Sequence, residues 1–215
     1  ILNYFHPYAF YWIINYISKG KCKQKDIFSI NKHHKIDYFR EIYIAQTDIM
    51  KQKPKSKLEK LFFKALDNHQ NGNLKEAEKI YLKIIKINSN IEVVQNNLGI
   101  IYLKLNRIKL AQSYFLKAIK INADFVEGYN NLALLKNQIG EYNESITYSK
   151  QVLEINPKFV NALYNLAYSY GKIDNKTNAI EYYLKTLAYD PNHFSACYNL
   201  ALTYFELGET KKSID

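Results

Sequence analysis

Two consecutive stretches decide the fold. Residues 92–125 read EVVQNNLGIIYLKLNRIKLAQSYFLKAIKINADF, and residues 126–159 read VEGYNNLALLKNQIGEYNESITYSKQVLEINPKF. Both contain Asn-Asn-Leu followed by a small residue, Gly99 in the first and Ala133 in the second. Extending the same interval along the chain gives repeats at 58–91, 92–125, 126–159, 160–193 and 194–215, the last one incomplete. A repeat of this length predicts a chain built from one supersecondary unit used several times.

Small residues occupy two places of every repeat. The eighth place holds Ala65, Gly99, Ala133, Ala167 and Ala201, and the twentieth holds Ala77, Ala111, Ser145, Ala179 and Ser213. A small side chain where two helices cross lets their backbones approach closely, whereas a larger one would force them apart. Apolar residues around each small column have the spacing of one helix face. Each repeat is therefore predicted to contain two helices that cross at these columns.

Turn residues recur between the predicted helices. The fifteenth place holds Gly72, Asn106, Gly140, Asp174 and Gly208, and the thirty-first holds Asn88, Asn122, Asn156 and Asp190. Gly, Asn and Asp are the residues that tolerate the left-handed conformation in which many helices end. Asn and Asp also favour turns through their own side chains. The pattern predicts that the first helix ends at the fifteenth place and the second at the thirty-first.

These columns resemble the tetratricopeptide repeat (TPR) family, whose unit is a helix pair of this length with small residues at the eighth and twentieth places. The resemblance covers residues 58–215. It implies an all-α fold, a right-handed superhelical solenoid of antiparallel helix pairs, with the first helices along a concave groove. It also implies a protein-interaction scaffold that binds extended or helical peptide segments. The sequence contains none of the common nucleotide-binding, hydrolase or metalloprotease motifs, so we predict no catalytic site within it.

An asparagine column runs through the predicted groove. It consists of Asn97, Asn131, Asn165 and Asn199 at the sixth place, with Asn96 and Asn130 beside two of them. A carboxamide both donates and accepts, so it can bind the C=O and N–H of an extended peptide. The column resembles the asparagine ladder of the O-GlcNAc transferase repeat region, which implies that these residues face the groove and bind peptide. The other interpretation is structural, with the amides satisfying polar groups of a neighbouring repeat.

Charge and residue types restrict the partner. The net charge is +10, but residues 1–56 hold ten Lys or Arg against four Asp or Glu, and residues 57–215 hold twenty against sixteen. The repeats are only mildly basic, which argues against nucleic acid as the partner. The second places lack the basic residues of the carboxylate clamp found in chaperone-binding TPR proteins: they are Glu59, Val93, Glu127, Asn161 and Ser195. No cofactor or metal is predicted, because the five histidines and two cysteines have no ligand spacing.

Residues 1–57 do not share the repeat. Residues 1–49 are open to three interpretations: helices that cap the first repeat, a truncated membrane span at residues 1–18, or upstream sequence foreign to the native protein, since Met50 is the only methionine. Residues 50–57, with Pro54 among lysines, are predicted to be a linker. Two distant cysteines and no secretory signal predict a cytoplasmic location, with membrane anchoring through residues 1–18 as the alternative.

A second functional interpretation makes the chain the substrate-recognition region of a larger enzyme. Asparagine-rich arrays of this kind resemble those joined to a glycosyltransferase or sulfotransferase domain. Such a domain would follow Asp215, which lies within the last predicted helix pair. Neither interpretation predicts the oligomeric state.

Overall fold

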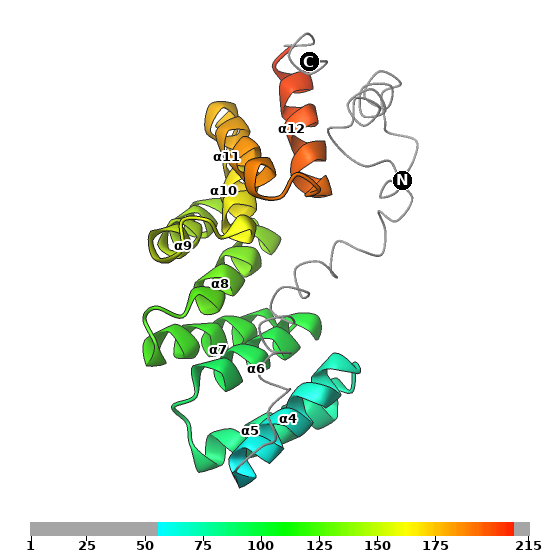
Figure 1. The fold of residues 1–215 in the computed structure, drawn as a ribbon, viewed down its shortest axis with the longest axis vertical. Coiled ribbons are helices and arrows are strands. Elements are labelled where there is room, and N and C mark those ends of the chain that lie inside the picture. The colour runs from blue at the N-terminus through cyan, green and yellow to red at the C-terminus, as the bar shows by residue number, and fades with distance from the viewer. Residues whose placement is uncertain (1–55, 209–215) are drawn as a thin grey trace. The chain divides into compact units, whose positions relative to one another are not determined.

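The computed structural model describes residues 56–208, and these residues form nine α-helices and no strand (Figure 1). They divide into two compact units, residues 56–139 and residues 140–208. The interpretations offered for residues 1–49, for the linker up to residue 55 and for Ser213 lie outside the described residues.

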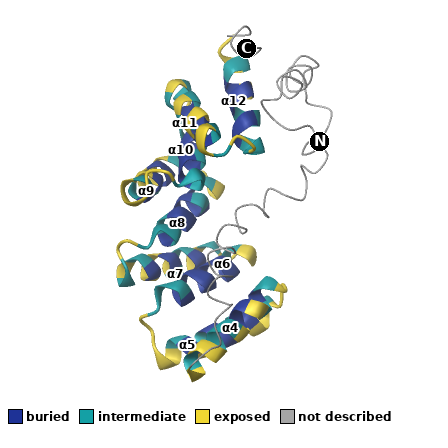
Figure 2. Ribbon diagram, viewed as in Figure 1, coloured by how far each residue is buried: buried dark blue, intermediate teal, exposed yellow. Residues whose placement is uncertain are grey.

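The unit of residues 56–139 contains α4 (Lys57–Gln70), α5 (Leu74–Ile87), α6 (Glu92–Lys104), α7 (Ile108–Ile121) and α8 (Val126–Gln138). Helix α4 pairs with α5 and α6 pairs with α7, and the two helices of each pair run antiparallel (Figure 1). Helix α6 also contacts α5 and α8, so it lies against helices of the repeats before and after its own. Residues Val94–Tyr102 of α6 are consequently all buried (Figure 2).

The unit of residues 140–208 contains α9 (Tyr142–Ile155), α10 (Val160–Lys172), α11 (Lys176–Tyr189) and α12 (Phe194–Glu206). Helix α10 packs against both α9 and α11, and α12 packs against α11. The buried cluster of this unit consists of Ala167, Ala179, Tyr183, Ala196 and Leu200. Each unit is built from packed helices without a strand, which confirms the predicted all-α fold of antiparallel helix pairs.

The predicted helix ends adopt the left-handed conformation in every repeat. The φ angles are 79° at Gly72, 57° at Asn106, 82° at Gly140, 61° at Asp174 and 68° at Gly208. A Cβ added at any of the three glycines would meet no atom within 4 Å, so backbone conformation and not lack of space favours glycine there. The prediction made from the fifteenth place is confirmed.

The thirty-first place closes the second helix through its side chain. Asn88, Asn122, Asn156 and Asp190 follow the last residue of α5, α7, α9 and α11. In each case the side-chain oxygen accepts a hydrogen bond from the backbone N–H two residues later, at 2.9 to 3.2 Å. This is an Asx turn, which redirects the chain toward the next repeat.

The start of α4 is fixed by a capping box. The Glu59 backbone N–H donates to Ser56 Oγ at 3.1 Å, and the Ser56 N–H donates to Glu59 Oε2 at 3.1 Å. Two backbone donors that a helix leaves unpaired are thereby satisfied. The first helix begins at Lys57, so the last two residues of the predicted linker, Ser56 and Lys57, belong to the helix and its cap.

The small columns lie at the helix crossings. Ala65, Ala77, Ala111, Ala133, Ala167 and Ala179 have no exposed surface. Gly99 has no room for a larger residue, because an added Cβ would lie 2.4 Å from Cε1 of the buried Phe115 ring. The overpacking argument made from the sequence therefore applies where α7 crosses α6 and its Phe115 ring meets Gly99.

Candidate functional site

The asparagine column forms hydrogen bonds between neighbouring repeats. In the unit of residues 56–139, Asn131 Nδ2 on α8 donates to Asn96 Oδ1 on α6 at 2.7 Å, and Asn97 Nδ2 donates to the Tyr81 hydroxyl oxygen on α5 at 3.1 Å. In the unit of residues 140–208, Asn199 Nδ2 on α12 donates to the Tyr164 hydroxyl oxygen on α10 at 3.1 Å. The amides of Asn97, Asn131 and Asn199 at the sixth place thus bond to the preceding repeat, as the structural interpretation predicts.

Five of the six predicted site residues are buried. Asn96, Asn97, Asn130 and Asn131 are 1% exposed and Asn165 is 4% exposed, whereas Asn199 is half-buried. The expectation that the amides lie open on the groove is therefore wrong for the first five. Such burial is possible because amide-to-hydroxyl and amide-to-amide bonds replace the bonds to water that enclosure removes. The binding of a peptide by these residues stays a prediction.

Asn199 belongs to an aromatic cluster that the sequence analysis missed. The Tyr164 ring lies 4.7 Å from the His193 ring, 6.1 Å from the Tyr183 ring and 6.3 Å from the Tyr168 ring. Burial raises the pKa of the Tyr164 hydroxyl to about 12, against the effect of hydrogen bonds from Ser195 and Asn199. The hydroxyl therefore stays neutral near pH 7 and can donate as well as accept. The sequence could have indicated this cluster through the position of Tyr164, which occupies the fifth place of its repeat, as Asn96 and Asn130 do.

A buried histidine lies between the first two repeats. His69 on α4 is 7% exposed, and its Nε2 lies 3.3 Å from Lys104 Nζ on α6. Burial, and then the positive charge of Lys104, lower the pKa of His69 to about 3. The imidazole is neutral at physiological pH and can accept a hydrogen bond from the ammonium group. His69 therefore links the repeats and is poorly suited to proton transfer near pH 7.

Residues 56–208 hold neither a metal-binding cluster nor a membrane-spanning helix. No group of three His, Cys, Asp or Glu lies close enough there to hold a metal ion. None of the described helices combines the length and the apolar character needed to cross a membrane.

Family models place this architecture among known repeats. One model described as tetratricopeptide repeat matches residues 94–125, 126–159 and 160–193, and a second with the same description matches residues 182–215. Together they run from residue 94 to residue 215, more than half of the chain. The chain belongs to the tetratricopeptide repeat family. No curated protein matches this TPR sequence.

Solved structures share the TPR fold at low sequence identity. A crystal structure of MamA is 23% identical with a TM-score of 0.64, covering 70% of this chain and 90% of MamA. MamA 41-end from Desulfovibrio magneticus RS-1 is 17% identical with a TM-score of 0.67, covering 74% and 89%. YrrB, described as a TPR protein with an unusual peptide-binding site, is 17% identical with a TM-score of 0.61, covering 83% and 87%.

Proposed function

We propose that this TPR chain is a protein-interaction scaffold that binds an extended or helical protein segment along the first helices of its repeats. The observation that carries the proposal is the recurrence of amide and hydroxyl groups at the fifth and sixth places, where Asn97, Asn131 and Asn199 are each oriented by a bond to the preceding repeat. Side chains that are already fixed lose little conformational entropy when a ligand binds. YrrB, which shares the fold, is described as having a peptide-binding site.

We propose Asn97, Asn131, Asn165 and Asn199, with Asn96 and Asn130, as the contact residues. A carboxamide has two N–H donors and two acceptor lone pairs, and the bond from Asn199 to Tyr164 uses one N–H. Asn199 is the most exposed of the six, so a peptide carbonyl reaches it with the least rearrangement. Contacts to the peptide backbone would give affinity with little sequence preference.

Peptides selected from a random library on the full chain provide the test. The affinity of a fluorescein-labelled selected peptide is measured by anisotropy for the wild type, for Asn199→Ala and for Asn143→Ala, a control that removes an exposed carboxamide on α9. Loss of one hydrogen bond should weaken binding by roughly three- to tenfold in Asn199→Ala and leave Asn143→Ala unchanged. Equal affinities of the two variants would contradict the proposal.

The buried members need a second comparison. In the double variant Asn131→Ala, Asn165→Ala, weaker peptide binding with unchanged helix content supports a contact role for the column. If the double variant unfolds, the buried amides act in stability and only the Asn199 region remains as the contact site.

We also propose a cytoplasmic location, in line with the distant cysteines. Fractionation of cells that express the native protein tests it. Retention in the membrane pellet after an alkaline wash would favour anchoring through residues 1–18 instead.

A further inference from the structure

The second helices of the first two pairs carry lysines at the same places of the repeat. Helix α5 carries Lys75, Lys83 and Lys86. The residues at the same places of the next repeat are Lys109, Lys117 and Lys120 on α7, and all six lysines are exposed. We call these six residues the lysine ladder. The equivalent residues are Asn143, Gln151 and Glu154 on α9 and Thr177, Lys185 and Ala188 on α11. The ladder is therefore confined to the unit of residues 56–139.

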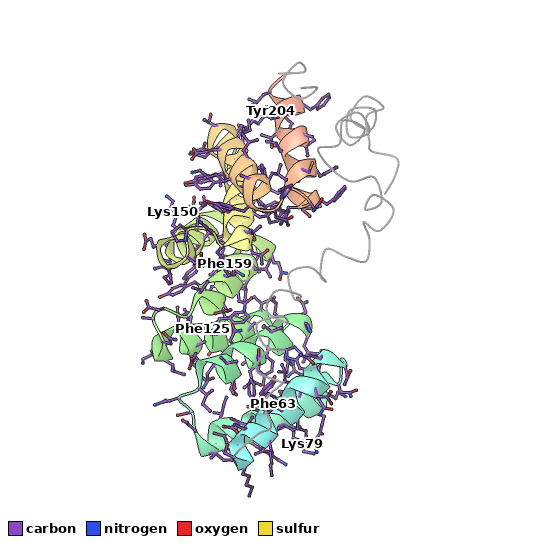
Figure 3. All side chains as sticks on the ribbon, viewed as in Figure 1. Phe63, Lys79, Phe125, Lys150, Phe159 and Tyr204 are labelled. Carbon is purple, nitrogen blue, oxygen red and sulfur yellow. The ribbon has the colours of Figure 1, made fainter. Side chains whose placement is uncertain are left out.

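Repetition places the lysines on one face. Helix α6 packs against both α5 and α7, so the two second helices belong to the same stack. Equivalent places of stacked repeats point in equivalent directions, and Lys83 follows Lys75 along α5 by about 12 Å at the usual helical rise. Figure 3 draws the side chains and marks Lys79, which lies on α5 within the same row. The result is two rows of cations one repeat apart.

Lysines outnumber the acidic residues on these two helices. Helix α5 carries four lysines against Glu76 and Glu78. Glu76 pairs with Lys79 at 3.5 Å and Glu78 accepts a hydrogen bond from the Tyr102 hydroxyl at 2.7 Å, so the helix keeps an excess of positive charge. Between Glu92 and Asp124 the sequence has no Asp or Glu, and α7 lies inside that stretch. The positive potential of the lysine ladder is therefore available to an incoming ligand.

The same face offers a hollow and apolar contacts. A hollow of about 340 Å³ lies along α5, lined by Lys75, Glu78, Lys79, Leu82, Lys83 and Lys86. Leu110 and Leu116 on α7 are 44% and 38% exposed, and Ile87 at the end of α5 is 63% exposed. Apolar side chains thus alternate with the cations, which a purely electrostatic surface would not require.

We propose that the lysine ladder docks an acidic amphipathic segment of a partner protein. Its carboxylates pair with the lysines, and its apolar side chains cover Leu110 and Leu116. A nucleic-acid backbone would complement the charges but leave these leucines uncovered. A lipid surface would require a broad exposed apolar side on the helix. The broad apolar side of α7, which contains Ala111, Phe115 and Ala118, is buried in the repeat, and of its apolar residues only the two leucines between the lysines are exposed. The ladder shares no residue with the asparagine column, so this inference does not depend on the proposed function.

The test uses the full chain and a labelled synthetic peptide of glutamate and leucine arranged as an amphipathic helix. Its affinity is compared for the wild type, for the ladder variant Lys117→Glu, Lys120→Glu, and for the control Lys150→Glu, Lys158→Glu, whose exposed lysines lie outside the ladder. Both variants change the net charge equally. We expect binding to weaken about tenfold or more in the ladder variant and less than about twofold in the control, and to weaken with added salt.

Three results would overturn the proposal. The first is that the peptide does not bind, or that it binds the ladder and control variants equally, which would mean that net charge alone acts. The second is that a peptide of the same composition in scrambled order binds as tightly, which would remove the role of the leucines. The third is that phosphatidylserine vesicles or a single-stranded oligonucleotide bind more tightly than the peptide with the same dependence on Lys117 and Lys120, which would assign the surface to another class of partner.

Discussion

Gly99→Ala should destabilise the protein, although alanine occupies the eighth place of every other repeat. The added Cβ would lie 2.4 Å from Phe115 Cε1 and 2.5 Å from Cδ1, well inside the usual carbon contact distance of about 3.5–4 Å. The Phe115 ring has no exposed surface, so it cannot move aside into solvent. The substitution therefore forces a shift in the packing of α7 on α6.

The expected magnitude is a difference of two effects. Overpacking of a filled core costs about 1–3 kcal/mol, and replacing glycine by alanine inside a helix returns about 1 kcal/mol. The free energy of unfolding should fall by about 1 kcal/mol. In a Phe115→Leu background the smaller side chain makes room for the methyl group, so the same substitution should become neutral or stabilising. The coupling between the two positions is then about 1–2 kcal/mol.

Urea titrations of the full chain, followed by circular dichroism, measure this double-mutant cycle. Gly171→Ala on α10 is the matched control, because its Cβ would meet Ala179 Cβ and Tyr183 Oη at an ordinary 3.8 Å. The control should raise the free energy of unfolding by up to about 1 kcal/mol through helix propensity alone. If Gly99→Ala stabilises as the control does, the Phe115 ring is not the reason for the glycine.

Three further substitutions follow from buried or strained groups. The pKa of His69 falls from 6.5 to about 3 on folding, so the unfolded chain takes up the proton first as the pH is lowered. The free energy of unfolding should therefore drop by about 2 kcal/mol between pH 7 and pH 5. In urea titrations at these two pH values, His69→Gln should show a smaller loss. Asn97→Ala leaves the Tyr81 hydroxyl without its partner in the core and should cost about 1–3 kcal/mol, much of it recovered when Tyr81→Phe is added. Asp174→Gly removes the backbone strain of a non-glycine residue at φ 61°. It should raise the free energy of unfolding by about 1 kcal/mol, which a higher thermal midpoint would show.

The features that the sequence predicted are those governed by local backbone chemistry. The left-handed conformation of Asn106 and Asp174 follows from the few residue types that tolerate it, whatever surrounds them. The Asx turns at Asn122 and Asn156 depend only on a side chain and the N–H two residues later. The same turn residues recur in every repeat, so the prediction of a helix-pair fold does not depend on any single residue.

The features that it missed depend on the direction of a side chain in three dimensions. Asn97 was expected in the groove, but the crossing of α6 and α5 brings its amide against the Tyr81 hydroxyl. Sequence spacing places a residue on a helix face and cannot say which neighbouring atom lies opposite. Gly99 was grouped with the alanines for the same reason, because only the coordinates show the Phe115 ring beside it.

The asparagine column and the lysine ladder differ in how much the fold depends on their residues. Asparagine recurs at the sixth place in four consecutive repeats, and in three of them it bonds to the preceding repeat. The fold itself is therefore a reason for the recurrence, and any contact role acts beside this structural one. The lysines of the ladder give way to Asn143, Gln151 and Glu154 on α9, which is a helix of the same length as α7. Helix formation therefore does not require them. Stability should consequently respond to loss of the buried amides and be nearly indifferent to Lys117→Glu, Lys120→Glu, and a large loss of stability in the ladder variant would refute that separation.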